Sequence, residues 1–272
     1  MKRRLLRSLN LVVCLWAMGA PLLAQGSRET AELNRSASAL FAQREFDKAI
    51  SQLRRSLQID PRQIGPMKML GLCYQLANQL EQAEGTLVAL TKLAPKDPEA
   101  WFFLGRVYYL QNFFDKALAA LETATLLNPR DYRISQQLAL TLEISGDTER
   151  AVKTYQEAIR LNETQPPPAA GLYADYGSLL YKLNQLDRAE RHLKRAKELD
   201  PADWRTYFEL GKVYFRLQKF ERAVYELEAG LKAPKGDPDR APRICHLLAQ
   251  AYLRLGREEE ARRALAVVEK SK

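Results

Sequence analysis

The sequence contains few of the residues from which catalytic and metal sites are usually built. Its 272 residues include two histidines, His192 and His246, and three cysteines, and none of them forms a C-x-x-C or H-x-x-x-H pair. It also has no glycine-rich phosphate loop. His192 falls within a predicted helix and is interpreted as a surface or packing residue. We therefore expect no enzyme activity, no cofactor and no metal ion.

Long hydrophobic runs are also lacking. The apolar run at residues 11–24 is shorter than the roughly 20 residues that a helix needs to cross a bilayer. Four basic residues precede it and small residues follow it, an order typical of a secretory signal. We expect a signal peptide at residues 1–24, cleaved after Ala24 or Gly26, and a short N-terminal segment at 25–29. The protein is then exported, periplasmic or secreted, without a permanent membrane anchor.

Removal of the signal changes both the charge and the cysteine count. The formal net charge of +9 falls by four to +5, because the signal holds four basic residues and no acid. That modest charge and the predicted export argue against a nucleic-acid partner. The remaining cysteines, Cys73 and Cys245, are far apart in the sequence. We interpret them as buried side chains, with an intermolecular disulfide as the alternative.

Alanine recurs in one register through the rest of the chain, at intervals of 34 residues that lengthen twice to 38. The register alanines are Ala49, Ala83, Ala117, Ala151, Ala189, Ala223 and Ala261. A second small residue, glycine or alanine, stands twelve positions before each of them. A fixed period of this length predicts supersecondary units that stack on one another to bury a continuous core.

The third unit reads W-x-x-L-G-x-x-Y from Trp101 to Tyr108, followed by Ala117 and Pro129. This resembles the tetratricopeptide pattern, although Ser135 replaces the aromatic residue in the fourth unit. The resemblance implies an all-α fold, a right-handed α-solenoid of antiparallel helix pairs that occupies residues 30–272. Its seven repeats would be residues 30–63, 64–97, 98–131, 132–165, 170–203, 204–237 and 242–272.

Two features of the repeats carry structural expectations. Gly71 and Gly105 fall inside predicted helices, where glycine costs about 1 kcal/mol relative to alanine, so we expect the backbone of the second helix to pack directly on them. Four extra residues occur around 166–169 and again around 238–241. We interpret both as longer loops between repeats and not as domain boundaries. They are either neutral surface variation or breaks that kink the superhelix.

The resemblance also implies a ligand site on the concave face, which the first helix of each repeat lines. The candidate groove residues are Lys68, Phe102, Arg106, Tyr109, Arg133, Tyr181, Lys182, Arg205, Phe208, Lys212, Phe215, Arg216, Arg243, His246 and Arg254. Basic residues alternate with aromatic rings in repeats five to seven, which suits an acidic peptide. The alternative is a solvated groove without a preferred ligand, because long basic side chains also cover apolar surface.

These features favour a scaffold or adaptor that binds a partner protein or peptide in its groove, with an acidic partner as one option. One alternative is an assembly factor or structural subunit of a bacterial envelope complex, such as pilus or outer-membrane machinery. Another is a noncatalytic subunit of an enzyme system. No separate capping helix follows the last repeat, so a homo-oligomer formed through that repeat is a further possibility.

Overall fold

The computed structural model describes residues 26–234 and 240–269, so the predicted signal peptide at 1–24 lies outside the described residues. Every regular element in these two ranges is a helix. The chain divides into two compact units, unit 1 up to Pro129 and unit 2 from Arg130. No helix among the described residues is both long enough and apolar enough to cross a membrane.

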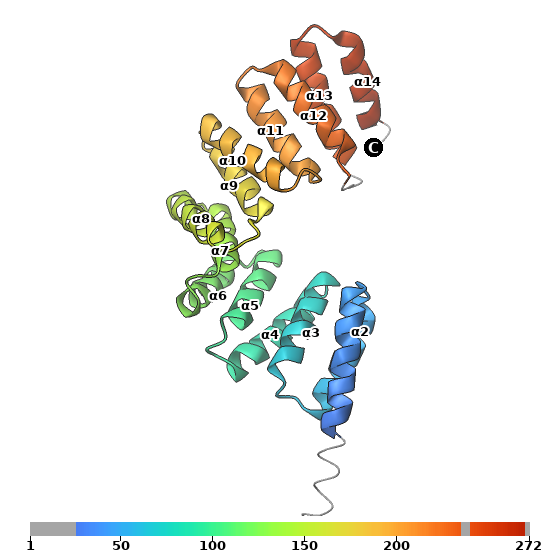
Figure 1. Ribbon diagram of the computed structural model, residues 1–272, viewed down its shortest axis with the longest axis vertical. Coiled ribbons are helices and arrows are strands. Elements are labelled where there is room, and N and C mark those ends of the chain that lie inside the picture. The colour runs from blue at the N-terminus through green and yellow to red at the C-terminus, as the bar shows by residue number, and fades with distance from the viewer. Residues whose placement is uncertain (1–25, 235–239, 270–272) are drawn as a thin grey trace, which may run out of the picture. The chain divides into compact units, whose positions relative to one another are not determined.

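Unit 1 holds three helix pairs (Figure 1). Its elements are a helix over residues 26–42, α2 (Phe46–Ile59), α3 (Ile64–Leu76), α4 (Leu80–Leu93), α5 (Pro98–Leu110) and α6 (Phe114–Leu127). Each helix packs against the next along the chain from α2 to α6, and α3 also packs against α5. The first helices of neighbouring repeats therefore lie side by side and share one face of the unit.

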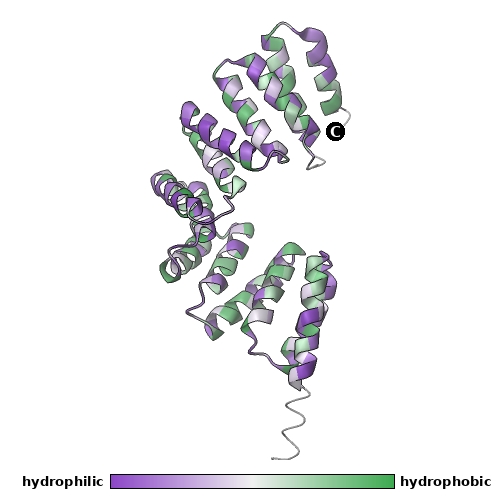
Figure 2. Ribbon diagram, viewed as in Figure 1, coloured by the Kyte–Doolittle hydropathy of each residue, from purple (hydrophilic) through white to green (hydrophobic). Residues whose placement is uncertain are grey.

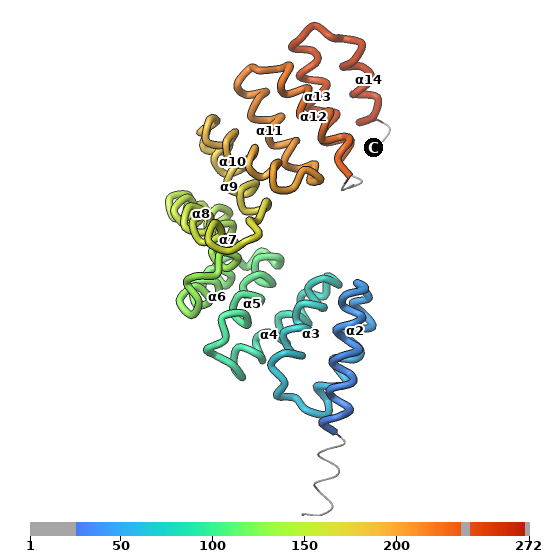
Figure 3. The backbone as a smooth tube through the Cα atoms, viewed as in Figure 1, coloured from blue at the N-terminus to red at the C-terminus, as the bar shows by residue number. Residues whose placement is uncertain are grey.

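Unit 2 repeats this arrangement in four further pairs, which the backbone trace follows in Figure 3. Its elements are α7 (Tyr132–Ile144), α8 (Thr148–Glu163), α9 (Ala170–Lys182), α10 (Leu186–Leu199), α11 (Trp204–Arg216), α12 (Phe220–Lys232), α13 (Arg240–Arg254) and α14 (Glu258–Glu269). Within it α11 packs against both α9 and α13. The predicted all-α solenoid of antiparallel helix pairs is confirmed.

The register alanines lie at the centre of the cores of both units, since each of the seven is at most 1% exposed. Apolar residues three and four positions apart lie on the same helix face as these alanines. In helices that are mostly polar, this apolar face is narrow. Figure 2 shows α6 mostly hydrophobic and α10 mostly hydrophilic, and α10 buries only Ala189, Leu193 and Ala196. Stacking of amphipathic helices therefore supplies the core, as a solenoid requires.

At four glycines inside the first helices, a leucine side chain from the second helix occupies the space next to the glycine Cα. A Cβ added at Gly71, Gly105, Gly177 or Gly211 would lie 2.6–2.7 Å from Leu87, Leu121, Leu193 or Leu227, respectively. The nearest backbone atoms of the second helix lie farther away, with the Ala117 carbonyl oxygen 3.4 Å from that position at Gly105. The expectation that the helix backbone fills these sites is therefore wrong. A branched side chain fills them instead.

The turn inside each helix pair uses one residue in the left-handed region, at φ between 58° and 84°. These residues are Arg44, Asn78, Asn112, Gly146, Asn184, Gln218 and Gly256. They stand five positions before each register alanine. Glycine and asparagine adopt this conformation readily, whereas arginine and glutamine do so at a cost.

Two boundaries differ from those expected from the sequence. Residues 26–29 are already helical and continue into the first repeat. Arg240 and Ala241 form the first turn of α13, so the second insertion is not entirely a loop. The first insertion does lie in a loop, at residues 164–169. Neither insertion separates the two units, because the division falls between Pro129 and Arg130.

Candidate functional site

The predicted groove residues all lie on the first helices of their repeats: α3, α5, α7, α9, α11 and α13. One of them is not available as an open contact. Phe102 is only 6% exposed, and the guanidinium carbon of Arg106 lies 5.6 Å from the centre of its ring. Phe102 therefore belongs to the packed part of α5, because its neighbours in the helix stack cover most of the ring.

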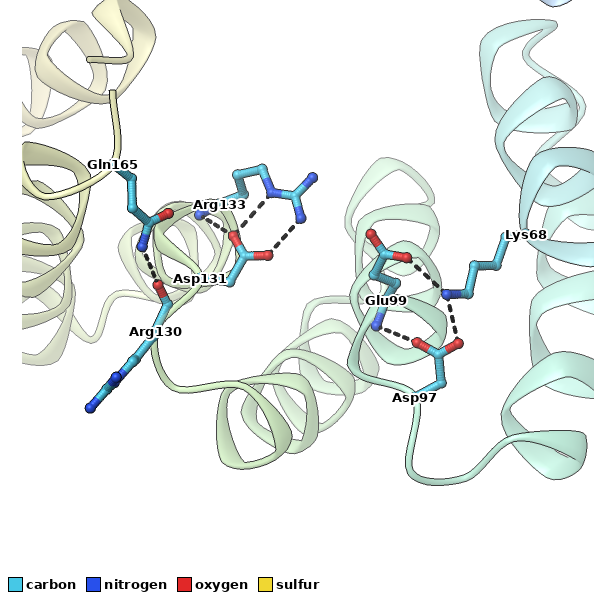
Figure 4. A network of polar contacts seen from close by, with 7 residues as sticks. All are labelled: Lys68, Asp97, Glu99, Arg130, Asp131, Arg133 and Gln165. Atoms are coloured by element: carbon cyan, nitrogen blue, oxygen red, sulfur yellow. Dashed lines mark hydrogen bonds and ion pairs between the residues drawn. The ribbon is translucent and has the colours of Figure 1, made fainter. Parts of the chain in front are cut away.

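Lys68 is neutralised inside unit 1 (Figure 4). Its Nζ lies 2.7 Å from Asp97 and 2.8 Å from Glu99, the cap and first turn of α5. Burial lowers the pKa of Lys68, but its hydrogen bonds to the two carboxylates outweigh this and hold the pKa above its ordinary value. Lys68 therefore joins α3 to α5 and contributes no free positive charge to a ligand.

Arg133 is paired in the same way at the start of α7, where Figure 4 shows its side chain beside Asp131. Two of its nitrogens donate to that carboxylate, at 2.6 and 3.0 Å. Burial alone would raise the pKa of Asp131, but the hydrogen bonds from Arg133 lower it below its ordinary value. Nearby, the Gln165 amide donates to the Arg130 carbonyl at 2.7 Å. This hydrogen bond connects the loop at residues 164–169 to the start of unit 2.

Three more predicted basic residues also have carboxylate partners within unit 2. Lys182 lies 2.7 Å from Glu143, Lys212 lies 2.7 Å from Glu209, and Arg205 lies 3.8 Å from Asp203. Local ion pairs therefore compensate three of the six basic residues predicted for the groove in repeats five to seven. The positive charge is concentrated in the remaining three, Arg216, Arg243 and Arg254.

A pocket of about 670 Å³ opens in unit 2 and contains two of those arginines. It is lined by Tyr181, Phe215, Arg216, Gln218, Phe220, Leu247, Gln250 and Arg254. These residues come from α9, α11, α12, α13 and the turn after α11. The volume falls within the range of about 300–1,000 Å³ common for ligand sites. We call this set the arginine pocket.

Arg216 is held in place by Tyr181. Its guanidinium carbon lies 4.3 Å from the centre of the Tyr181 ring, and its Nη1 donates to the Tyr181 carbonyl at 3.3 Å. Lys212 lies over the same ring at 4.5 Å. Among the described residues, no carboxylate lies within 4.0 Å of Arg216 or Arg254. Both arginines can therefore give their donors to a ligand, and the arginine–tyrosine contact orients one of them in advance.

The other lining residues are three aromatic side chains, one leucine and two glutamines, Gln218 and Gln250. The rings of Phe215 and Phe220 meet edge to face with their centres 5.4 Å apart. Gln250 is hydrogen-bonded to the His246 ring at 3.0 Å. An acidic group next to a bulky apolar side chain matches this mixture, since the arginines would bind the charge while the rings cover the apolar part.

Four pocket residues were not among the predicted groove positions: Gln218, Phe220, Leu247 and Gln250. Gln218 and Phe220 belong to the turn and the start of the second helix, which the family rule for first-helix positions does not include. Conversely, Phe208, Arg243 and His246 do not line the pocket.

The remaining reactive side chains have packing roles. The His192 ring lies 4.8 Å from that of Tyr176 and 6.2 Å from that of Tyr173, and burial followed by nearby Arg188 and Arg191 lowers its pKa. Cys73 and Cys245 are free and buried, which confirms their interpretation as core side chains. Burial raises the pKa of Cys73 to about 11. No cluster of potential metal ligands occurs within residues 26–234 and 240–269.

Sequence profiles described as tetratricopeptide or TPR repeats match residues 40–107, 98–131, 132–165, 177–218 and 242–266. The chain is a tetratricopeptide repeat protein. Two of these matches, 98–131 and 132–165, have the same limits as the third and fourth repeats expected from the alanine register. The family and fold are those of proteins that generally act as non-catalytic scaffolds, and this solenoid is suited to protein–protein interaction.

Among curated relatives, BBSome complex member BBS4 of Mus musculus is 33% identical over 222 residues. The match covers 81% of this chain and 41% of BBS4, so the chain spans less than half of that relative's length. A tetratricopeptide repeat protein from Parabacteroides merdae ATCC 43184 has a TM-score of 0.66 at 16% identity, over 90% of this chain and 93% of its own. PilW, described as a widely conserved type IV pilus biogenesis factor, has a TM-score of 0.68 at 19% identity, over 76% and 92%. These two likenesses show the fold.

Proposed function

We propose that the protein is an exported scaffold or adaptor and that the arginine pocket of unit 2 binds an acidic segment of a partner protein. The observation that carries this proposal is the contrast among the basic residues. Lys182, Arg205 and Lys212 each have a carboxylate partner, whereas Arg216 and Arg254 line one pocket and have no carboxylate partner within residues 26–234 and 240–269. Two arginines that line one pocket favour an acidic ligand, whose carboxylates could accept hydrogen bonds from both.

The contribution of each arginine to the binding affinity can be derived from the usual strength of a hydrogen bond to a charged group. A hydrogen bond to a charged group contributes about 1.5–3 kcal/mol, and 1.4 kcal/mol corresponds to a tenfold change in the dissociation constant. Loss of either arginine should therefore weaken binding of an acidic segment by about tenfold or more. The apolar wall formed by Phe215, Phe220 and Leu247 should add affinity for a segment with an aromatic or aliphatic side chain beside its acidic residue.

The binding test compares two doubly substituted proteins, Arg216→Gln with Arg254→Gln and, as the control, Arg191→Gln with Arg263→Gln. The control removes the same charge from exposed arginines on α10 and α14, outside the pocket. Fluorescence anisotropy would measure binding of labelled peptides that combine glutamate and phenylalanine, with lysine-containing counterparts as a comparison. We expect at least a tenfold loss for the pocket variant alone, and weaker binding by the unaltered protein at higher salt. Equal binding by both variants would contradict the proposal.

Export is tested separately. The full chain and a chain without residues 1–24 would be expressed in a bacterium and the cell fractions assayed, with the mature N-terminus determined by mass spectrometry. The proposal expects export of the full chain alone and a terminus directly after Ala24 or Gly26. Retention of both proteins in the cytoplasm would remove the export part of the proposal and leave the binding part standing.

The open face of α14 favours a second candidate, a structural subunit of an envelope assembly. Leu265 is 38% exposed, although the leucines at its register position in five other repeats, such as Leu87 and Leu121, are fully buried. The PilW likeness is compatible with this candidate but extends to the fold only. Loss of self-association or complex assembly on Leu265→Ser, with the arginine variants unaffected, would favour the structural role over the adaptor.

A further inference from the structure

Leu126 on α6 is the most exposed large hydrophobic residue in the part of the chain that the structure describes, at 83%. It stands nine positions after Ala117, so it points away from the buried face of its helix by half a turn. Five other repeats carry a polar or charged residue at this position: Gln58, Lys92, Arg160, Glu198 and Lys232. The leucine is therefore an exception to the register, and packing within unit 1 does not explain it.

The surface of α6 around Leu126 carries little charge. Only three of the 14 residues of α6 are charged, compared with eight of 14 in α10, and Figure 2 shows the same contrast in hydropathy. Ala119 and Thr123 share the outer side of α6 with Leu126, and the Thr123 hydroxyl already donates to the Ala119 carbonyl at 2.8 Å. Contact with another protein surface would therefore bury apolar groups here without leaving that hydroxyl unpaired.

The second helix of the preceding repeat, α4, has an acid at its start and a base at its end. Glu81 lies in its first turn and Lys92 in its last, and both are exposed. Neither side chain has an ion pair or a hydrogen bond with any described residue. Gly85 lies between them on the same side, and no atom lies within 4 Å of the position that its Cβ would take. Both charges are therefore available to an approaching surface.

A second copy of this surface, packed antiparallel, matches both helices. Leu126 and Ala119 are seven residues apart, which is about two turns, so reversal of α6 about its centre places the leucine of one copy on the alanine of the other. Because α4 has the same register, the same reversal places Lys92 over Gly85 of the second copy, about one turn from its Glu81. A lysine side chain can span that distance, so opposite charges meet twice across the contact.

We infer that the outer face of α4 and α6 binds a second copy of this chain in a two-fold antiparallel contact. Each of these helices has 14 residues and is about 21 Å long. Two helices per copy bury less than about 1,200 Å² in total, the low end for specific interfaces, so the dimer is weak and reversible. The contact lies on second helices and leaves the first-helix groove open. It rests on residues of unit 1 alone and does not depend on the proposed function.

Sedimentation equilibrium of the complete chain over a range of concentrations measures this self-association. Leu126→Lys should weaken it by about tenfold or more, because the substitution removes the central apolar contact. Tyr225→Lys is the matched control and should associate as the unaltered chain does, since Tyr225 is 68% exposed on α12, a second helix of unit 2. Circular dichroism of each variant verifies that the helical content is unchanged.

Two outcomes of that comparison would overturn the inference. Equal losses in Leu126→Lys and Tyr225→Lys would indicate nonspecific adhesion of exposed apolar side chains. A loss on Leu265→Ser, with Leu126→Lys unaffected, would place the contact on α14.

Charge reversal gives the sharper measurement. Glu81→Lys and Lys92→Glu should each weaken self-association, because like charges then face each other across the contact. An equal mixture of the two variants should recover it as a mixed dimer, since each lysine then faces a glutamate. A mixture that does not recover the association would overturn the inference, as would an unaltered chain that stays monomeric at millimolar concentration. Unchanged peptide binding by the arginine variants of unit 2 would leave it intact.

Discussion

Replacement of Gly105 by alanine tests the leucine-filled packing of the helix pairs most directly. Gly105 lies in the middle of α5, and a Cβ there would stand 2.7 Å from Leu121 Cγ and 3.4 Å from the Ala117 carbonyl oxygen. Cγ is the branch point of a fully buried side chain, so it cannot move aside without displacing its neighbours. The helices α5 and α6 would have to separate by several tenths of an ångström.

Two opposing effects set the change in the free energy of unfolding that Gly105→Ala should cause. Alanine is favoured over glycine within a helix by about 1 kcal/mol. Overpacking of a close-packed core costs about 1–3 kcal/mol. The expected sum for Gly105→Ala is a destabilisation of about 1 kcal/mol, opposite in sign to the helix propensity.

Gly85→Ala supplies the control, because Gly85 lies inside α4, is exposed, and has no atom within 4 Å of the position that its Cβ would take. That substitution should stabilise the protein by about 1 kcal/mol. Urea unfolding followed by circular dichroism would give both free energies of unfolding, compared at a common m value. A Gly105→Ala protein as stable as the Gly85→Ala protein would refute the role assigned to Leu121.

Two further substitutions follow from backbone conformation and from burial. Arg44 has φ 62°, a conformation that costs arginine more than glycine, so Arg44→Gly should raise the free energy of unfolding by about 1 kcal/mol. Gln43→Gly in the same turn is the control and should give no such increase. Urea unfolding of both variants would measure the difference. Burial raises the pKa of Asp175 to about 6, although the Gln136 amide donates to it at 2.7 Å and opposes the rise. The folded state therefore holds this proton more tightly than the unfolded state, and stability falls as the pH rises from about 4 to 6. Asp175→Asn should abolish this loss, on the order of 2–3 kcal/mol, in unfolding measured at pH 4 and 7. An identical pH dependence in both proteins would show that the carboxyl is not buried.

The candidate site was only partly predictable. Sequence register placed Arg216, Arg254, Tyr181 and Phe215 on one face, and the structure brings all four to one pocket. Pairing of the basic residues was not predictable from the register. Lys182 meets Glu143 from a neighbouring repeat, 39 residues away, at a distance that depends on how α9 packs on α7.

The sequence by itself determined the helix pairs. A small residue that recurs every 34 positions indicates stacked repeats, and asparagine or glycine in five of the seven turns allows the left-handed backbone that closes each pair. The alanine register and the turn residues can be recognised within the sequence itself, without knowing which helices pack against one another.

Only the tertiary structure decided which charges remain available to a ligand and what fills the glycine sites. Both depend on atoms from different helices meeting within a few ångströms: Leu121 against Gly105, or Asp97 against Lys68. A periodic sequence fixes which residues share a face, but not which of them pair across it. For this protein, that difference selects two of the basic residues predicted for the groove, Arg216 and Arg254, which line one pocket.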